Sequence, residues 1–586
     1  MNSRMKHMIF RIVKVFLCVG LLLSSLTSLS AQNNIIAALN FDPAKNGFGF
    51  PNYRNKGYNW EDDIGKDDLI RMFGVEAPCK SGNSSASCVL KADAQTWMQK
   101  KLVAMNIGHC EGIAVACLRL YSGMPFKGRQ SVSNFLSGAK SPSDLRLDQT
   151  LENYIAYYWI TQDFREISNA TVANSKKSPV ELVQMLIDSM TKGGETYTLG
   201  IWKSGKRTGN RQDGHAVVPF RIEDAGTFFK IHVYDNEFPK QTRYLTVNKT
   251  GNQQWTYSRD AIQKAKSEYT GNTGTHTLEL TPTSARDMRG GKCFDSTFAY
   301  DNDRAIGCDD QTASLIQPVF TNASFRGNAF ARDQDGEDAE FFLTGEGNML
   351  VTDASGRRVG YDPDTNRFYD TIPNCVLTSK IGGFGIDLPD YYLPYEDIDG
   401  YYTVVFSGND LDAESEFDFV FSAPGFTVGF NGIRLDPNEK LTAKISYDGE
   451  EIKFTASADG ETPEVFYSFD PENNKDFSYL TEIGGVQLTA KKSLTYNFDF
   501  ENGKLFFSDN DGNEDSYDIE LIRLNYNGSK QEYTKNNLDI GKADRYEMDF
   551  GDWDGEGDSM CFKDDEDGDG FGGDEECDNQ PNEKPR

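Results

Sequence analysis

Residues 108–121 read G-H-C-E-G-I-A-V-A-C-L-R-L-Y and set the architecture of the first part of the chain. From Cys110 onward, apolar residues recur three and four positions apart, which predicts a helix over residues 110–121 with a buried face. Gly123 and Pro125 follow, and residues of these types end helices. Similar patterns predict three further helices, at residues 92–102, 151–159 and 179–190.

After Gly193 the sequence changes character and predicts strands. Short runs rich in Val, Ile, Phe and Tyr are bounded by Gly, Asn and Asp, which is typical of strands separated by turns. These runs are residues 196–202, 216–222, 227–234 and 243–247. Helices first and strands second predict an α+β domain, which we place at residues 32–282.

Three side chains on these elements form a candidate catalytic set. Cys110 opens the helix, His215 opens a strand-like run, and Asp235 closes the next run. A helix N-terminus and a nearby imidazolium stabilise a thiolate, an imidazole moves the proton, and a carboxylate orients the imidazole. The two runs and their turn have the length of a hairpin that brings Asp235 beside His215. Asn236 is the alternative orienting residue, and strand alternation puts His232 on the opposite face.

The segments G-H-C-E-G-I-A, G-H-A-V-V-P-F and V-Y-D-N-E-F-P resemble the papain-like cysteine peptidase superfamily. The closer likeness is to its bacterial branches around the bacteriocin-leader-processing peptidases, and it covers residues 90–250. The resemblance implies a papain-like domain with Cys110 as nucleophile, His215 as base and Asp235 as orienting group. It also implies a protein or peptide substrate and no cofactor for catalysis.

The chain departs from that family at the oxyanion hole. Papain-like enzymes carry a Gln six residues before the nucleophile, and Ala104 stands at that position here. Gln99 and Asn106 are therefore the candidate oxyanion donors. Residues 110–125 also resemble transglutaminase-like enzymes, which use the same chemistry to transfer an acyl group to an amine. A third alternative is a non-enzymatic, calcium-binding surface or adhesion protein in which the papain-like domain is a relic.

The first residues have the form of an export signal. Basic residues precede an apolar run at 15–23, and small residues at 28–31 offer a cleavage site before Gln32. We therefore expect a signal peptide at residues 1–31 and a protein that is secreted or held at the cell surface. No other long apolar stretch occurs, so no transmembrane helix is expected. The net charge of −30 argues against nucleic acid and anionic membranes as partners.

Cysteine parity predicts an unpaired thiol. Of the ten cysteines, Cys18 leaves with the signal peptide, and an odd number cannot pair completely within one exported chain. Gly108 and Gly112 leave space around Cys110, as a reactive thiol requires, whereas Cys117 lies on the apolar face and suits a core role. Three pairs close in sequence are disulfide candidates: Cys79–Cys88, Cys293–Cys308 and Cys561–Cys577.

Beyond residue 282 the helix signals disappear. Strand-like runs follow at short intervals between Asn, Asp and Gly turns. We expect two all-β, sandwich-like modules at residues 283–410 and 411–546, with a cell-surface or matrix ligand as a candidate partner. The residues at 547–586 form an acidic tail that is too poor in apolar groups to build a core unaided.

The acidic tail contains one calcium-loop spacing. Carboxylates at loop positions one, three and five, Gly at six, a backbone carbonyl at seven and Glu at twelve match that spacing. The candidate ligands are Asp565, Asp567, Asp569, Phe571 and Glu576. With its flanking Cys561 and Cys577, the segment resembles thrombospondin type 3 repeats, which implies a structural calcium ion.

Overall fold

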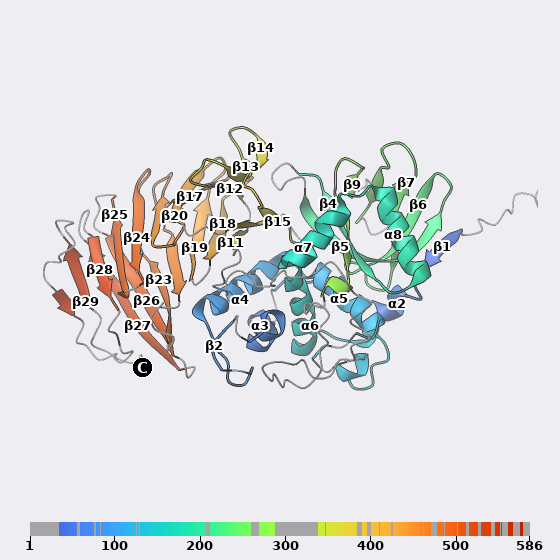
Figure 1. Cartoon of the computed structure of the whole chain (residues 1–586), viewed down its shortest axis with the longest axis horizontal. Coiled ribbons are helices and arrows are strands. Elements are labelled where there is room, and N and C mark those ends of the chain that lie inside the picture. The colour runs from blue at the N-terminus through green and yellow to red at the C-terminus, as the bar shows by residue number, and fades with distance from the viewer. Residues whose placement is uncertain are drawn as a thin grey trace, which may run out of the picture.

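A computed structural model describes residues 34–286 and 338–577, apart from short stretches within them. These stretches are residues 56–58, 76–77, 83, 125, 128, 130, 206–210, 260–268, 346, 384–388, 395–399, 410, 424–425, 461, 470–476, 486, 501, 511–514, 526–528, 541–544, 551–552, 554–560 and 566–574. The described residues form an α+β domain followed by a large all-β body (Figure 1). The predicted order of an α+β part and an all-β part is confirmed.

The helices lie in the first half of the α+β domain. They are α2 (Pro43–Asn46), α3 (Lys66–Phe73), α4 (Ala92–Ala104), α5 (Cys110–Tyr121), α6 (Gln149–Ile160), α7 (Arg165–Ser175) and α8 (Pro179–Lys192). The four helices predicted from the sequence correspond to α4, α5, α6 and α8 and are confirmed. Helix α7 has no predicted counterpart, because its many polar and β-branched residues hide the helical period.

Helix α5 is the centre of the α+β domain. All its residues from Cys110 to Arg119 are buried, since α6 and a central strand of the sheet both pack against it. Gly112 permits the close approach of α6, because a side chain there would collide with the carbonyl oxygen of Ile155. The nucleophile candidate therefore stands at the end of a helix fixed on several sides.

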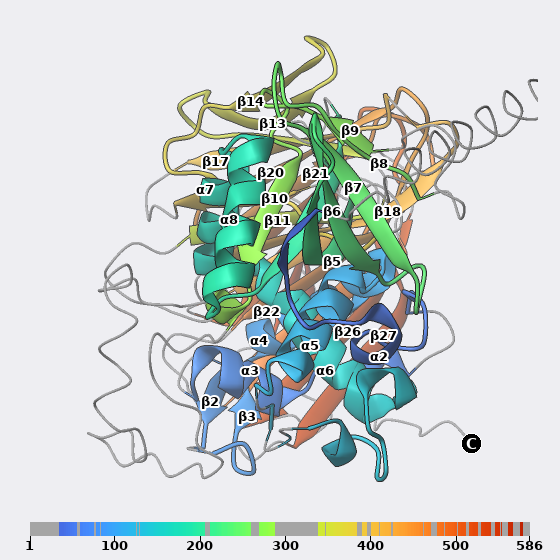
Figure 2. The same ribbon diagram turned by 90° about the vertical axis from the view of Figure 1, so that its right-hand side faces the viewer.

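One antiparallel sheet of eight strands forms the second half of the domain, in the order β10-β4-β5-β6-β7-β8-β9 with β1 beside β5. Its strands are β1 (Ile35–Ala38), β4 (Tyr197–Lys203), β5 (Gln212–Asp224), β6 (Phe228–Asp235), β7 (Thr242–Asn248), β8 (Trp255–Tyr257), β9 (Tyr269–Gly271) and β10 (Leu278–Pro282). Ala216 and Val218 of β5 belong to the core around α5, whereas Val217 belongs to the core under α8. Helices α7 and α8 lie along one side of this sheet (Figure 2).

Two large antiparallel sheets make up the β body. The first contains, in spatial order, β15 (Val376–Thr378), β16 (Asp390–Pro394), β11 (Asp338–Thr344), β18 (Ser415–Ala423), β19 (Phe426–Leu435), β22 (Glu464–Phe469), β23 (Phe477–Gly484), β26 (Asp515–Asn525) and β27 (Lys530–Ile540). The second contains β14 (Arg367–Asp370), β13 (Arg358–Asp362), β12 (Asn348–Thr352), β17 (Tyr401–Ser407), β20 (Lys440–Ser446), β21 (Glu451–Thr455), β24 (Ser493–Asp499), β25 (Lys504–Asp509), β28 (Arg545–Asp549), β29 (Cys561–Asp565) and β30 (Glu575–Cys577). One apolar core, from Ala339 to Trp553, lies between them.

The β body is not divided where the sequence predicts a boundary. Strand β17 pairs with β20 and β11 pairs with β18, so both sheets continue across residue 410. The turn-rich stretch 408–414 leads from a strand of one sheet to a strand of the other, which explains why it reads as a boundary. The sheet also continues past residue 546, because Met548, Phe550 and Trp553 add apolar side chains to the core.

The described cysteines include unpaired thiols, as their odd number predicts. Cys79 and Cys88 form a disulfide between β2 (Cys79–Ser81) and β3 (Val89–Leu90), as predicted. Cys110, Cys117 and Cys375 are free thiols. The candidate pair Cys293–Cys308 lies outside the described residues. Cys561 and Cys577 stand opposite each other in the pairing of β29 with β30.

The acidic tail is described only in part. Asp565 ends β29 and Glu576 lies in β30, while Asp567, Asp569 and Phe571 fall outside the described residues. Within the described part of the chain, no helix is long and apolar enough by itself to cross a membrane. The adjacent pair α4 and α5 passes such a test only when both are taken together, and they are bent by 95°. The signal peptide predicted at residues 1–31 also lies outside the described residues.

A buried ionic cluster joins the two parts of the molecule. The Lys101 ammonium on α4 lies 3.1 Å from Asp163, 2.5 Å from Glu340 and 3.0 Å from Asp390. Lys380 adds a second cation, 2.8 Å from Asp390. We call these five residues the interface cluster. Burial opposes the charge on Lys101, but the three carboxylates outweigh it and raise the pKa of the ammonium well above its ordinary value.

Candidate active site

The three predicted catalytic side chains meet where α5 begins. In the pairing of β5 with β6, Asp235 stands opposite Val217, two residues beyond His215. This register lets Nε2 of His215 reach Oδ1 of Asp235 at 2.8 Å. The other ring nitrogen, Nδ1, lies on the side of the Cys110 sulfur: a Cβ on Gly383 would lie 3.1 Å from Nδ1 and 3.2 Å from the sulfur. Nδ1 itself has no hydrogen-bond partner among the described residues. The thiol, imidazole and carboxylate thus form one linear array.

The carboxylate of this array is held by groups on either side. The Tyr257 hydroxyl donates a hydrogen bond to Oδ2 of Asp235, and the Glu237 backbone N–H donates to Oδ1 at 2.8 Å. Burial opposes the charge on Asp235, but the His215 imidazolium and these donors outweigh it and lower the pKa of the carboxyl. A carboxylate that stays ionised fixes the tautomer and the orientation of His215.

The pKa values of the His215 imidazole and the Cys110 thiol are both raised. Burial opposes a charge on His215, but Asp235 and Glu237 outweigh it and hold the pKa of the imidazole well above its ordinary value. Burial raises the pKa of the Cys110 thiol, and the neighbouring imidazolium offsets part of that rise. Cys110, His215 and Asp235 are all fully shielded from solvent. Burial at this site therefore disfavours the Cys110 thiolate, while Asp235 favours the protonated imidazole.

Two hydrogen-bond donors converge beside the thiol. The Cys110 backbone N–H lies 3.3 Å from the carbonyl oxygen of Gly382, and Nδ2 of Asn52 lies 2.8 Å from the same oxygen. Asn52 is held in place because its Oδ1 accepts from the backbone N–H groups of His109 and Tyr53. This pair of donors has the form of an oxyanion pocket at a helix N-terminus.

Neither predicted oxyanion candidate lies in this pocket. The side chains of Gln99 and Asn106 are exposed to solvent. Asn52 was missed because it stands far from Cys110 in sequence, in the irregular stretch before α3. A short motif around the nucleophile cannot reveal a donor that arrives from another part of the chain.

The other polar candidates have structural contacts instead. Nδ2 of Asn236 donates to the carbonyl oxygens of Cys110 and Ala216, so this residue ties α5 to β5 and does not orient His215. His232 lies 3.0 Å from Glu223. His109 hydrogen-bonds the backbone of Tyr53, and burial lowers the pKa of its imidazole to about 4.

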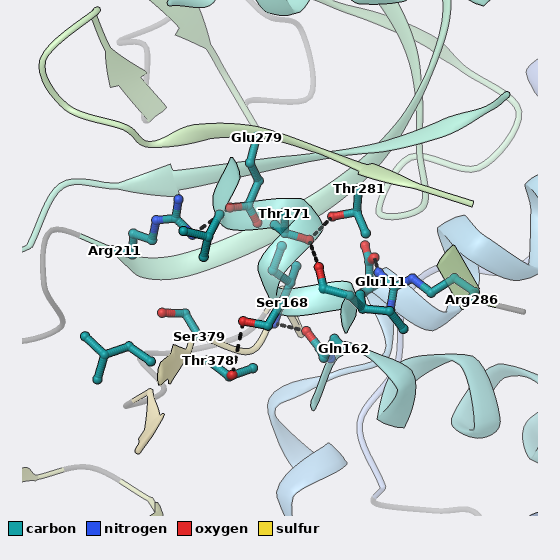
Figure 3. Close-up of a pocket in the computed structure, with 14 residues that line it drawn as sticks. Glu111, Gln162, Ser168, Thr171, Arg211, Glu279, Thr281, Arg286, Thr378 and Ser379 are labelled. Atoms are coloured by element: carbon teal, nitrogen blue, oxygen red, sulfur yellow. Dashed lines mark hydrogen bonds and ion pairs between the residues drawn. The ribbon is translucent and has the colours of Figure 1, made fainter. Parts of the chain in front are cut away.

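A small pocket lies between α7, β10 and the chain that follows β15, and Glu111, next to Cys110 in the sequence, lines it (Figure 3). Its wall contains two ion pairs, Glu111 with Arg286 and Arg211 with Glu279. Ile381 lines the pocket, and its backbone N–H donates to the Gln162 side chain at 2.7 Å. The pocket therefore borders the same chain segment that reaches the Cys110 thiol.

Comparison of the chain with protein-family models, with curated proteins and with solved structures finds no match. Among the described residues, no group of three or more His, Cys, Asp or Glu side chains is placed to hold a metal ion.

Proposed function

We propose that this protein is an exported cysteine hydrolase that cleaves peptide bonds through a thioacyl-enzyme. The observation that carries the proposal is the array of Cys110, His215 and Asp235 beside two donors that share one carbonyl oxygen. A nucleophile, a base, an orienting group and an oxyanion pocket are the parts that acyl transfer requires. The Cys79–Cys88 disulfide supports an oxidising compartment.

Each of these residues has a defined step in the proposed reaction. The Cys110 thiol gives its proton to Nδ1 of His215, and the thiolate attacks the carbonyl carbon of the peptide bond. The oxygen that gains negative charge accepts hydrogen bonds from the Cys110 N–H and from Asn52. The C–N bond breaks as His215 returns the proton to the leaving amine. His215 then deprotonates a water, which attacks the thioester and releases the acid product and the thiol.

Covalent labelling of the full chain tests this proposal. A peptide electrophile that reacts with thiolates should modify Cys110 under reducing conditions between roughly pH 5 and 8, where imidazole titrates. Because Gly383 lies against the thiol, the measurement includes a Gly383→Val variant, which removes that contact. Cys117→Ala is the matched control, since it removes the other free thiol of α5 and should keep the label. If neither the wild type nor the Gly383→Val protein is labelled at Cys110, the proposed hydrolase is excluded.

An amine acceptor separates hydrolysis from amide transfer. Both reactions pass through the same thioester, and they differ in whether water or an amine resolves it. Peptide cleavage without incorporation of a labelled amine supports the peptidase. Incorporation into glutamine-containing peptides would favour the transglutaminase-like alternative instead.

Replacing Asn52 with Asp should lower kcat by about 10²–10³-fold, the usual effect of losing one oxyanion donor. The introduced carboxylate can still accept hydrogen bonds from the His109 and Tyr53 backbone N–H groups, but it cannot donate one to the oxyanion. Steady-state kinetics of the Gly383→Val protein, with and without the second change, measures the effect. Asn55→Asp is the control, because Asn55 is also buried but donates to Leu102, away from the thiol. Equal losses in both variants would show that Asn52 has only a structural role.

Two further assignments remain proposals of ours. The tail would take a structural calcium ion through Asp565, Asp567, Asp569, Phe571 and Glu576, and the pairing of β29 with β30 supports a loop closed at its ends. The β body would supply the surface for a cell-surface or matrix ligand.

A further inference from the structure

The catalytic array is covered by a segment from the other half of the molecule. Residues 380–383, which follow β15, leave the β body and run across the N-terminus of α5. We call these four residues the covering segment. The complete burial of Cys110 and His215 arises in part from this segment, because Gly383 stands against both reactive atoms.

The covering segment binds the site through its backbone. The Gly382 carbonyl oxygen occupies the pocket formed by the Cys110 N–H and Nδ2 of Asn52. The Gly383 N–H donates to the carbonyl oxygen of Gly214 at 3.1 Å, directly before His215. The groups that would hold a reacting peptide thus already hold a peptide of the same chain.

The fit depends on the absence of side chains at both glycines. A Cβ on Gly383 would lie 2.7 Å from Nδ2 of Asn52, 3.1 Å from Nδ1 of His215 and 3.2 Å from the Cys110 sulfur. Gly383 also has a φ of +93°, which side chains rarely adopt. A Cβ on Gly382 would collide with the side chain and backbone of Ile107. Two adjacent glycines therefore allow the backbone to reach the thiol.

Contacts upstream of the glycines anchor the covering segment. The Ile381 backbone N–H donates to Gln162, and the Ile381 side chain is buried in the core of the α+β domain. Lys380 belongs to the interface cluster through Asp390. Just before the segment, the Thr378 hydroxyl lies 3.3 Å from that of Ser168 on α7. The same residues that join the two halves of the molecule thus hold the cover in place.

We propose that the covering segment is a built-in inhibitor, and that the chain is a latent hydrolase until this segment leaves the site. The inference rests on the proposed function for its consequence on activity. Its structural part, that residues 380–383 shield the Cys110 thiol, stands independently. Activation requires that Gly382 vacate the oxyanion pocket, so that a substrate carbonyl can enter.

The test compares alkylation of Cys110 by iodoacetamide in the full-length wild type and in Gly383→Val, quantified by peptide mass. We expect the variant to react at least about tenfold faster, because reaction follows the population of the uncovered state. Uncovering also reverses the burial that raises the pKa of the Cys110 thiol, so the alkylation profile should move to lower pH in the variant. Cys117, buried in the same helix, should stay protected in both proteins.

Gly356→Val is the matched control. Gly356 also has a positive φ, of +77°, and lies in the β body, but no atom would lie within 4 Å of a side chain there. This variant shares the backbone strain without touching the site, so its Cys110 should react like the wild type. Gly382→Ala provides a second route to the same result if Gly383→Val does not fold, since it collides with Ile107 and not with the array.

The outcomes separate the inhibitor from the hydrolase. Faster alkylation together with new peptide turnover supports both, whereas faster alkylation without turnover supports the cover and contradicts the proposed function. Equal alkylation of the wild type, both glycine variants and the control would overturn the cover, whatever the turnover. Cleavage of the wild-type chain between Gly382 and Gly383 would also overturn it, because the segment would then be a substrate.

Discussion

Replacing His215 with alanine should lower peptide turnover by at least ~10²-fold, whereas the same change at His232 should leave most of the turnover intact. His215 is the histidine that hydrogen-bonds the Asp235 carboxylate and turns its other ring nitrogen toward the Cys110 thiol. Without its imidazole, no neighbouring group takes the thiol proton or returns it to the leaving amine. His232 lies in β6, the same strand as Asp235, but pairs with Glu223 away from the site.

Both variants are measured in the Gly383→Val protein, so that the cover does not mask the difference. Labelling of Cys110 by the peptide electrophile should fall in parallel with turnover, because the thiolate loses its imidazolium partner. The His232→Ala protein controls for the loss of a histidine from the same sheet. If the His232→Ala protein were inactive and the His215→Ala protein active, the array would not perform the chemistry.

Replacing Lys101 with methionine should destabilise the folded chain by about 3–5 kcal/mol, the usual cost of removing one partner from a buried ionic group. Lys101 is fully buried and is the shared partner of Asp163, Glu340 and Asp390. Its removal leaves three buried carboxylates beside one ammonium of the cluster, that of Lys380. Trp97 and Tyr392 still donate hydrogen bonds to Glu340. Since the cluster spans both halves of the molecule, the loss should appear first as separation of the α+β domain from the β body.

Urea unfolding and limited proteolysis of the full chain measure this effect. Lys100→Met is the control, because Lys100 stands beside Lys101 on α4 and is partly buried too, but it hydrogen-bonds the uncharged Asn431 and its ion pair with Asp418 is longer, at 3.8 Å. We expect a smaller loss there than at Lys101, because no set of three buried carboxylates loses its shared partner. Adding Glu340→Gln and Asp390→Asn to Lys101→Met should restore part of the stability, because fewer buried charges then lack a partner. A Lys101 variant as stable as the Lys100 variant would contradict the argument.

The sequence revealed most of the local structure of the α+β domain. The helical period starting at Cys110 marks α5, and the β-rich runs after Gly193 correspond to β4, β5, β6 and β7. The pairing across β strands far apart in sequence was not visible, because alternation tells which face a residue occupies and not which strand lies beside it. For that reason the stretch near residue 410 was mistaken for a boundary, although it connects the two sheets.

The residues of the candidate site also fall into two groups, those that could be found from the sequence and those that could not. Cys110, His215 and Asp235 could be found because each stands at the end of a recognisable helix or strand and because histidine is scarce in the chain. Asn52 and Gly382 could not, since they come from irregular segments, one near the start of the α+β domain and one after β15. Their contribution depends on tertiary packing, which brings a main-chain carbonyl and a side-chain amide together.

The attachment of the covering segment makes it an intramolecular ligand. Strands β15 and β16 are hydrogen-bonded neighbours, so the chain between them leaves and re-enters the β body at nearly the same place. A group tethered this closely acts at an effective concentration in the millimolar range, which a dilute external substrate does not match. The same four residues supplied as a free peptide would be a weak inhibitor, because they would lose both the tether and the rigid sheet that orders them. The tethered covering segment therefore outcompetes a dilute external substrate for the site beside the thiol.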